Sequence, residues 1–158
     1  MSELLRVIPS ITLKLAQAAL ATALAEAERH AVKVSIAIVG PGGEPVLSAH
    51  MDDAPAPSRT IALNKATSAA GFRSSTADWE ARLERCSSMV RQGLPLQGGL
   101  ALFGGGEPFL YQGEVVGAIG ISGASEALDI ACARAARSGV ERLLQGTSEH
   151  ASGGSVVA

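Results

Sequence analysis

Apolar residues recur at helical spacing near the start of the chain and in short β-branched runs after it. After Thr12, a suitable N-cap, leucines and alanines recur every three or four residues as far as His30, which predicts a helix. The runs 34–39 and 45–51 flank a Gly-Pro-Gly-Gly turn, a pattern typical of a β-hairpin. The first third of the chain is therefore predicted to be a helix followed by a hairpin.

The middle of the chain is predicted to be helical and then irregular. Ser58 is a suitable cap for a helix that runs to about residue 72, and a further helix is expected over residues 76–89. Residues 92–108 are rich in glycine and weakly patterned, so only a short strand over 100–103 is expected there before the triple glycine interrupts it.

A second hairpin is predicted from residues 109–111 and 115–122, joined by a Gln-Gly-Glu turn. Gly117 and Gly120 fall inside its second strand, which indicates that another element packs closely there. A last helix is expected to begin near Ser125. Two hairpins among helices favour an α/β (α+β) fold with an antiparallel sheet, since hairpins do not make parallel sheets.

Composition limits the classes of function. The chain has 158 residues, 47% of them hydrophobic, enough for one domain with a sizeable core. A net charge of −2 without any basic run argues against nucleic acid, and the absence of a long apolar run argues against a membrane span. No signal peptide is evident, so a cytoplasmic location is expected. Cys86 and Cys132 are expected to be reduced thiols.

Lys65 is the first candidate for chemistry. On a helical wheel it falls in the apolar arc with Phe72, so its stem must lie along the packed face and its ammonium needs an acidic or ligand partner. A structural carboxylate, solvent and a ligand are all partners open to it. Arg59 and Arg73 flank the same helix and are candidates to bind an anionic ligand, although both also suit a solvated surface.

His50 is the candidate metal ligand. It ends a strand and precedes an acidic pair, residues 52–53, that could orient its imidazole, so the options are a metal or haem ligand, a proton-transfer group or a structural side chain. Ser122 ends the last strand, where its hydroxyl could line a pocket. Gly105 and Gly106 allow backbone amides to approach a ligand beside Glu107, and the alternative there is a plain loop.

The stretch from Thr12 to about Leu144 resembles the GlcG/HbpS proteins, which are similar to the C-terminal domain of PduO-type cobalamin adenosyltransferases. The resemblance rests on the first helix and strand and on four further segments: GGEPVLSAHMDDAP, ALNKATSAAGF, FGGGEPF and GEVVGAIGISGAS. It divides the chain into an N-terminal extension over 1–11, a domain over 12–145 and a tail over 146–158 that is expected to be disordered.

The resemblance implies a profilin-like sandwich around an antiparallel sheet of about five strands, homo-oligomers, and, in some members, binding of haem or a related tetrapyrrole. The family's pocket positions match here at Lys65, Phe72, the glycine loop and Ser122. Gly40 and Glu44 replace an Asp and a His that many members carry, so haem ligation through that His is not implied.

Two functions follow as hypotheses. In the first, the protein is a small-ligand-binding module that takes haem or a related tetrapyrrole, with His50 or a less regular group as axial ligand and Arg59, Lys65 or Arg73 pairing with propionates. In the second, it is a cofactor-independent isomerase, tautomerase or lyase acting on a small carboxylated metabolite. There Lys65 would neutralise the carboxylate, and His50 or Glu107 would move a proton.

Overall fold

The computed structural model describes residues 3–152 and the side chains of residues 3–147. A four-stranded sheet and its helices make up this part of the chain. The elements in chain order are α1 (Leu13–Arg29), β1 (Ser35–Val39), β2 (Pro45–His50), α2 (Ser58–Phe72), the 3-10 helix η1 (Thr76–Asp78), α3 (Trp79–Glu84), α4 (Ser88–Gly93), the 3-10 helix η2 (Leu94–Leu96), β3 (Gly106–Tyr111), β4 (Glu114–Ser122) and α5 (Glu126–Ser152).

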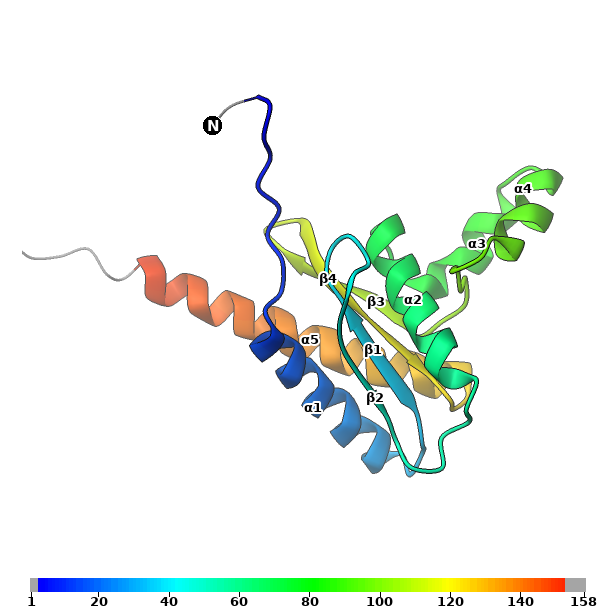
Figure 1. The fold of residues 1–158 in the computed structure, drawn as a ribbon, viewed down its shortest axis with the longest axis horizontal. Helices are drawn as coiled ribbons and strands as arrows, with labels where there is room; N and C mark the ends of the chain where they lie inside the picture. Colours follow the sequence, from blue (N-terminus) through cyan, green and yellow to red (C-terminus); the bar gives the residue numbers. More distant parts are fainter. Residues whose placement is uncertain (1–2, 153–158) are drawn as a thin grey trace, which may run out of the picture.

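The helices lie on both faces of the sheet (Figure 1). α1 and α5 pack against each other and cover one face, whereas α2 packs on the other. α3 and α4 project away from the sheet. The side chain of Thr12 accepts a hydrogen bond at the start of α1, and that of Ser125 does so at the start of α5, as expected for N-caps. The α/β fold with an antiparallel sheet that the hairpin pattern predicts, and the sandwich that the resemblance implies, are both confirmed.

The strand order is β2-β1-β4-β3 and every neighbouring pair is antiparallel. β2 and β3 are therefore the two edges. Ser35 of β1 is in register with His50 of β2 on one side and with Ser122 of β4 on the other. Because directly opposed residues share a face of the sheet, these three side chains form one row across three strands.

A glycine in β4 allows α2 to pack directly on the centre of the sheet. A Cβ at Gly120 of β4 would overlap the carbonyl oxygen of Ala62 and approach the amide nitrogen of Ala66 to 2.6 Å. At Gly117 a Cβ would lie 2.7 Å from the carbonyl oxygen of Val39. The close packing predicted at both glycines is confirmed. α2 consequently packs chiefly on β4, β1 and β3 and leaves the edge strand β2 largely uncovered on this face.

Two parts of the predicted secondary structure are wrong. The single helix expected over 76–89 is instead η1, α3 and α4, because the Ser87 hydroxyl caps a new helix by accepting from the Val90 amide. Residues 100–103 form no strand, and β3 begins at Gly106 rather than at residue 109. The sheet thus has four strands in the described part of the chain, not about five.

α5 continues past Gln145, where the sequence places the end of the domain, as far as Ser152. Between these positions Gly146 is the only residue with a strongly unfavourable helix propensity, and no proline interrupts the run. The helix therefore includes residues 146–152 of the segment expected to be a disordered tail. Residues 153–158 of that segment lie outside the described residues.

Candidate functional site

A groove of about 340 Å³ runs between the edge strand β2 and the first half of α2. It exists because α2 is seated over β4 and stops short of β2. Its volume lies at the small end of the range of about 300–1,000 Å³ that ligand pockets occupy. Small and apolar side chains line much of it, and polar groups lie among them. The lining includes Ala37, Leu47, Ser48, His50, Arg59 and Leu63.

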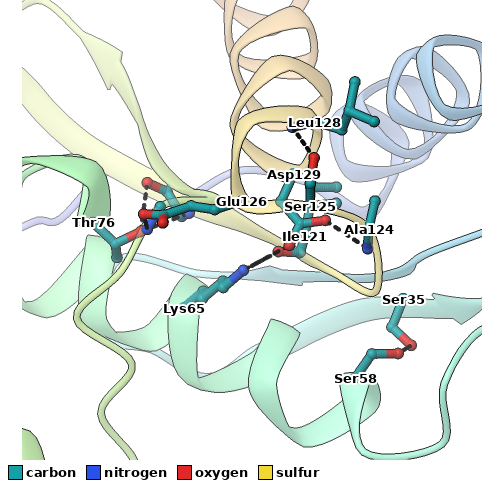
Figure 2. Close-up of polar contacts among 12 residues, drawn as sticks. Ser35, Ser58, Lys65, Thr76, Ile121, Ala124, Ser125, Glu126, Leu128 and Asp129 are labelled. Carbon is teal, nitrogen blue, oxygen red and sulfur yellow. Dashed lines mark hydrogen bonds and ion pairs between the residues drawn. The ribbon is translucent and has the colours of Figure 1, made fainter. Parts of the chain in front are cut away.

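His50 lines this groove and is held by a chain of hydroxyl groups. Its Nδ1 lies 2.6 Å from Oγ of Ser35, which lies 2.8 Å from Oγ of Ser58. Ser58 in turn donates to the carbonyl oxygen of Pro55 at 2.5 Å. Figure 2 shows the contact between the two serines, one from β1 and one from the start of α2. Ser35, and not the acidic pair at residues 52–53, makes the hydrogen bond that orients the imidazole.

Arg59 is exposed in the first turn of α2 and lines the same groove as His50. Within residues 3–147 no carboxylate pairs with its guanidinium. The structure therefore brings together two of the predicted residues, an imidazole and a cation that is available to an anion. His50 ends β2 and Arg59 lies in the first turn of the next element, α2, and they line the same groove because of the way α2 packs on the sheet.

Lys65 is buried away from this groove, with 1% of its side chain exposed. Its Nζ lies 2.9 Å from Oδ2 of Asp129 and donates to the carbonyl oxygen of Ile121 at 2.8 Å. Figure 2 shows the ammonium directed at this carbonyl near the start of α5. Burial raises the pKa of the Asp129 carboxyl above its ordinary value, and the charge of Lys65 opposes that rise. Of the partners open to Lys65, the structural carboxylate is the one observed.

The glycine loop packs against this ion pair. Gly105 has φ +120°, and a Cβ there would lie 2.8 Å from Nζ of Lys65. A Cβ at Gly106 would lie 2.5 Å from the Lys65 carbonyl oxygen. The amide of Gly106 donates to Oγ1 of Thr76, and that of Gly104 to Oε1 of Glu126. These two amides are thus already hydrogen-bonded within the protein.

Glu107 lies on the opposite edge strand from His50. Three inter-strand spacings of about 4.8 Å separate the two edges, so β2 and β3 are roughly 14 Å apart. Glu107 is buried, and its Oε2 accepts from Ser75 at 2.5 Å and from Arg137 at 3.0 Å. Its Oε1 has no hydrogen bond and lies 3.4 Å from Nε of Arg134. His50, Lys65 and Glu107 therefore do not share one site.

Phe72 and Arg73 lie at the far end of α2. Phe72 packs edge-on against Trp79 with the ring centroids 4.6 Å apart. Arg73 caps the helix in the left-handed region, at φ 57°, and pairs with the exposed Glu114 at 2.8 Å. Ser122, in contrast, lies near the groove, because it stands in the same row as Ser35 and His50.

Gly40 and Glu44, the two departures from the family pattern, are neighbours in the turn between β1 and β2. A Cβ at Gly40 would overlap the carboxylate of Glu44. The Glu44 side chain is exposed, so its carboxylate could move aside for a side chain at position 40.

Sequence reasoning missed Ser35 and Ser58 as site residues. Ser35 begins a strand that is otherwise apolar. The sequence predicts only a capping role for Ser58, which is wrong, because the N-cap of α2 is Pro57 and the helix has no side-chain capping hydrogen bond. For Ser35, the only local signal in the sequence is a serine at the start of a predicted apolar strand, and in the structure this serine is 1% exposed. Strand register sets its contact with His50 and the packing of α2 sets its contact with Ser58, and one sequence shows neither.

Residues 3–147 contain no group of three or more His, Cys, Asp or Glu side chains that could hold a metal ion. A metal at His50 would thus have a single protein ligand from this chain. Among the described helices, none combines the length and the apolar character that crossing a membrane requires.

The strand order and the helix packing define an α/β sandwich with a groove at one sheet edge. A family model described as "Haem degrading protein HbpS-like" matches residues 11–138. The chain belongs to this HbpS-like family, as the resemblance at Thr12 to Leu144 implies.

Three relatives place the chain within the family. An uncharacterized 15.0 kDa protein from Citrobacter freundii, encoded between dhaT and dhaS, is 35% identical over 73% of this chain and 82% of its own length. The crystal structure of Klebsiella pneumoniae protein ORFY is 31% identical, with TM-score 0.80 over 89% of this chain and 96% of its own. A structure of a PduOC:heme complex is 25% identical, with TM-score 0.75 over 82% and 94%.

Proposed function

We propose that the protein binds a small anionic ligand in the groove between β2 and α2, and that this ligand is haem or a related tetrapyrrole. The observation that carries the proposal is that His50 and Arg59 line one groove while Nδ1 of the imidazole is hydrogen-bonded to the Ser35 hydroxyl. An imidazole that ligates a metal through one nitrogen is typically hydrogen-bonded through the other. Nε2 of His50 is the nitrogen left for such a bond.

The lining of the groove supplies the side-chain types that hold a haem, and a groove of about 340 Å³ would enclose one part of it. His50 would ligate the iron, Arg59 would pair with a propionate, and Leu47 and Leu63 would contact the apolar ring. Bound iron would supply ligand-binding and redox chemistry at Nε2 of His50. The family description and the haem complex of the PduOC relative support this choice of ligand. Lys65 and Arg73 have carboxylate partners elsewhere, so Arg59 is the cation to which we assign the propionate.

The second hypothesis, a cofactor-independent isomerase, tautomerase or lyase, gains no support from the geometry. It needs Lys65 to meet a substrate carboxylate next to a proton-transfer group. Lys65 is buried and paired with Asp129, and Glu107 lies on the other edge of the sheet from His50. A cytoplasmic location and assembly into homo-oligomers are part of the proposal as expectations from the sequence.

Titration of the purified protein with haemin tests the proposal. We expect a saturable shift of the Soret band that is lost or strongly weakened in His50→Ala, because the iron loses its protein ligand. Arg59→Gln should weaken binding and leave the position of the band unchanged, since the axial ligand is retained. The matched controls are His30→Ala and Arg73→Gln, which change the same residue types outside the groove. An equal titration of wild type and His50→Ala would refute the assignment.

A further inference from the structure

Two serines that no sequence motif singles out hold the candidate ligand residue. Ser35 is 1% exposed and Ser58 is 2% exposed, so neither hydroxyl exchanges hydrogen bonds freely with water. Together they link Nδ1 of His50 to the carbonyl oxygen of Pro55 through three consecutive contacts of 2.6, 2.8 and 2.5 Å. The chain starts at the groove and ends on a backbone atom of the loop before α2.

The direction of each hydrogen bond in this series follows from the last one, between the Ser58 hydroxyl and the Pro55 carbonyl oxygen. A carbonyl oxygen only accepts, so Ser58 must donate its one hydroxyl proton to Pro55. Ser58 then has no proton left for Ser35, and Ser35 must be the donor between the two serines. A contact of 2.5 Å without a proton between Ser58 and the carbonyl would place two oxygen lone pairs against each other.

The same step fixes the proton of the imidazole. Ser35 has given its only hydroxyl proton to Ser58, so it can only accept from His50. The proton of the neutral imidazole must then reside on Nδ1. Nε2 carries the lone pair, and no hydrogen bond within the described residues occupies it.

We propose that Ser35 and Ser58 are positioning residues that hold neutral His50 as its Nδ1–H tautomer, with Nε2 as the electron-pair donor of the groove. The groove then selects ligands that present an electron-pair acceptor, either a metal ion or a hydrogen-bond donor, to Nε2. It also means that Ser35 is not a nucleophile activated by His50, because the imidazole donates to Ser35 and does not withdraw its proton. The extension to haem rests on the proposed function, whereas the tautomer does not.

Nitrogen-15 NMR of the protein without ligand tests the tautomer directly. Multiple-bond correlations between ring protons and ring nitrogens distinguish the two neutral forms, and His50→Asn assigns the signals. At a pH where the ring is neutral, wild type should show the Nδ1–H form. In Ser58→Ala the Ser35 hydroxyl proton is released and can turn to Nδ1, so we expect the population to shift toward the Nε2–H form.

Conservative variants separate positioning from structural support. Ser58→Thr keeps the hydroxyl and should retain the Nδ1–H form, and Ser48→Ala removes another groove hydroxyl outside the chain and should leave the tautomer unchanged. Ser35→Ala provides a second route should Ser58→Ala fail to fold, because it removes the acceptor from His50 and should give a mixture. Finding the Nε2–H form in wild type, or the same tautomer in both Ala variants as in wild type, would overturn the proposal.

Haem affinity links the tautomer to binding. If only the Nδ1–H form is competent, the apparent Kd rises in inverse proportion to its population, about twofold at one half and about tenfold at one tenth. Ser58→Ala should therefore weaken haemin binding by the factor that its NMR populations predict. Wild-type protein that shows the Nδ1–H form without binding haemin would refute the haem assignment and leave the positioning role of the serines intact.

Discussion

Replacing Lys65 by methionine tests whether the buried ion pair serves the fold. Nζ lies 2.9 Å from Oδ2 of Asp129, and the two side chains are only 1% and 4% exposed. Methionine preserves most of the stem and removes the charge. Loss of one partner from such a pair costs about 3–5 kcal/mol, because the other charge stays buried without compensation. A domain's whole stability is about 5–15 kcal/mol, so the effect should be large.

Urea denaturation followed by tryptophan fluorescence measures this loss. Trp79 is the single tryptophan and is 2% exposed, which makes it a suitable reporter of unfolding. The matched control is Arg73→Met, which breaks the pair with Glu114, whose side chains are 56% and 62% exposed. Exposed pairs contribute about 0–1 kcal/mol, so this variant should be nearly as stable as wild type.

The stability lost in Lys65→Met should depend on pH. Burial already raises the pKa of the Asp129 carboxyl, and loss of the opposing ammonium raises it further. A carboxyl with a raised folded-state pKa stabilises the fold below its unfolded pKa, and this stabilisation is lost as the pH rises through the folded value. The difference from wild type should thus be larger at neutral pH than below 3.8, the ordinary pKa of aspartate.

A double variant completes the test. Lys65→Met combined with Asp129→Leu removes both charges and should recover much of the lost stability, since apolar replacements of buried pairs are often neutral. If Lys65→Met costs no more than Arg73→Met, the pair is not structural. Lys65 would then regain its place as a candidate cation for a ligand.

Three further predictions concern packing and burial. Gly120→Ala should lower the free energy of unfolding by about 3 kcal/mol or more, since the new methyl group would overlap the Ala62 carbonyl. Gly71→Ala is the matched control: a Cβ there meets nothing within 4 Å, so it should stabilise the protein by about 0.5–1 kcal/mol. Urea denaturation of both variants measures the two effects. Burial raises the pKa of the Cys132 thiol from 9.0 to about 11. The stability that the protonated thiol contributes below pH 9.0 should therefore be lost as the pH rises through about 11, and the free energy of unfolding of Cys132→Ala, measured over the same pH range, is the reference. In the native protein at neutral pH a thiol reagent should modify the half-buried Cys86 and spare Cys132, and equal labelling of both would contradict this.

Local signals account for the parts of the fold that the sequence predicted. The second hairpin is an example, because its turn residues Gln112 and Gly113 both adopt positive φ, at 51° and 78°, the conformation that tight hairpin turns require. The sequence predicts that β3 begins only at residue 109, three residues too late, because Gly106 and Pro108 resemble strand breakers. Pro108 is tolerated since β3 is an edge strand, and Gly106 is needed because a Cβ there would meet the Lys65 carbonyl.

The site was less predictable than the fold because its partners are distant in sequence. The helical wheel placed the Lys65 stem on the packed face, which is confirmed, but the carboxylate that pairs with it is 64 residues away. The hydroxyl chain that holds His50 likewise joins a strand, a helix start and an edge strand, over separations of 15 and 23 residues. Sheet register brings Ser35 to His50, and the packing of α2 and α5 on the sheet brings Ser58 and the Lys65–Asp129 pair to their partners.

The groove itself follows from packing at Gly120. Without a side chain at this position, the backbone of α2 can lie directly on β4, which is separated from the edge strand β2 by β1. A helix diameter of about 10–12 Å spans little more than two strand spacings of about 4.8 Å, so a helix centred on β4 covers β1 and β3 and cannot also cover β2. The face of β2 that carries His50 is therefore left open beside Arg59. One glycine, recognised in the sequence only as a place of close approach, thus determines where the groove that we propose as the ligand site lies.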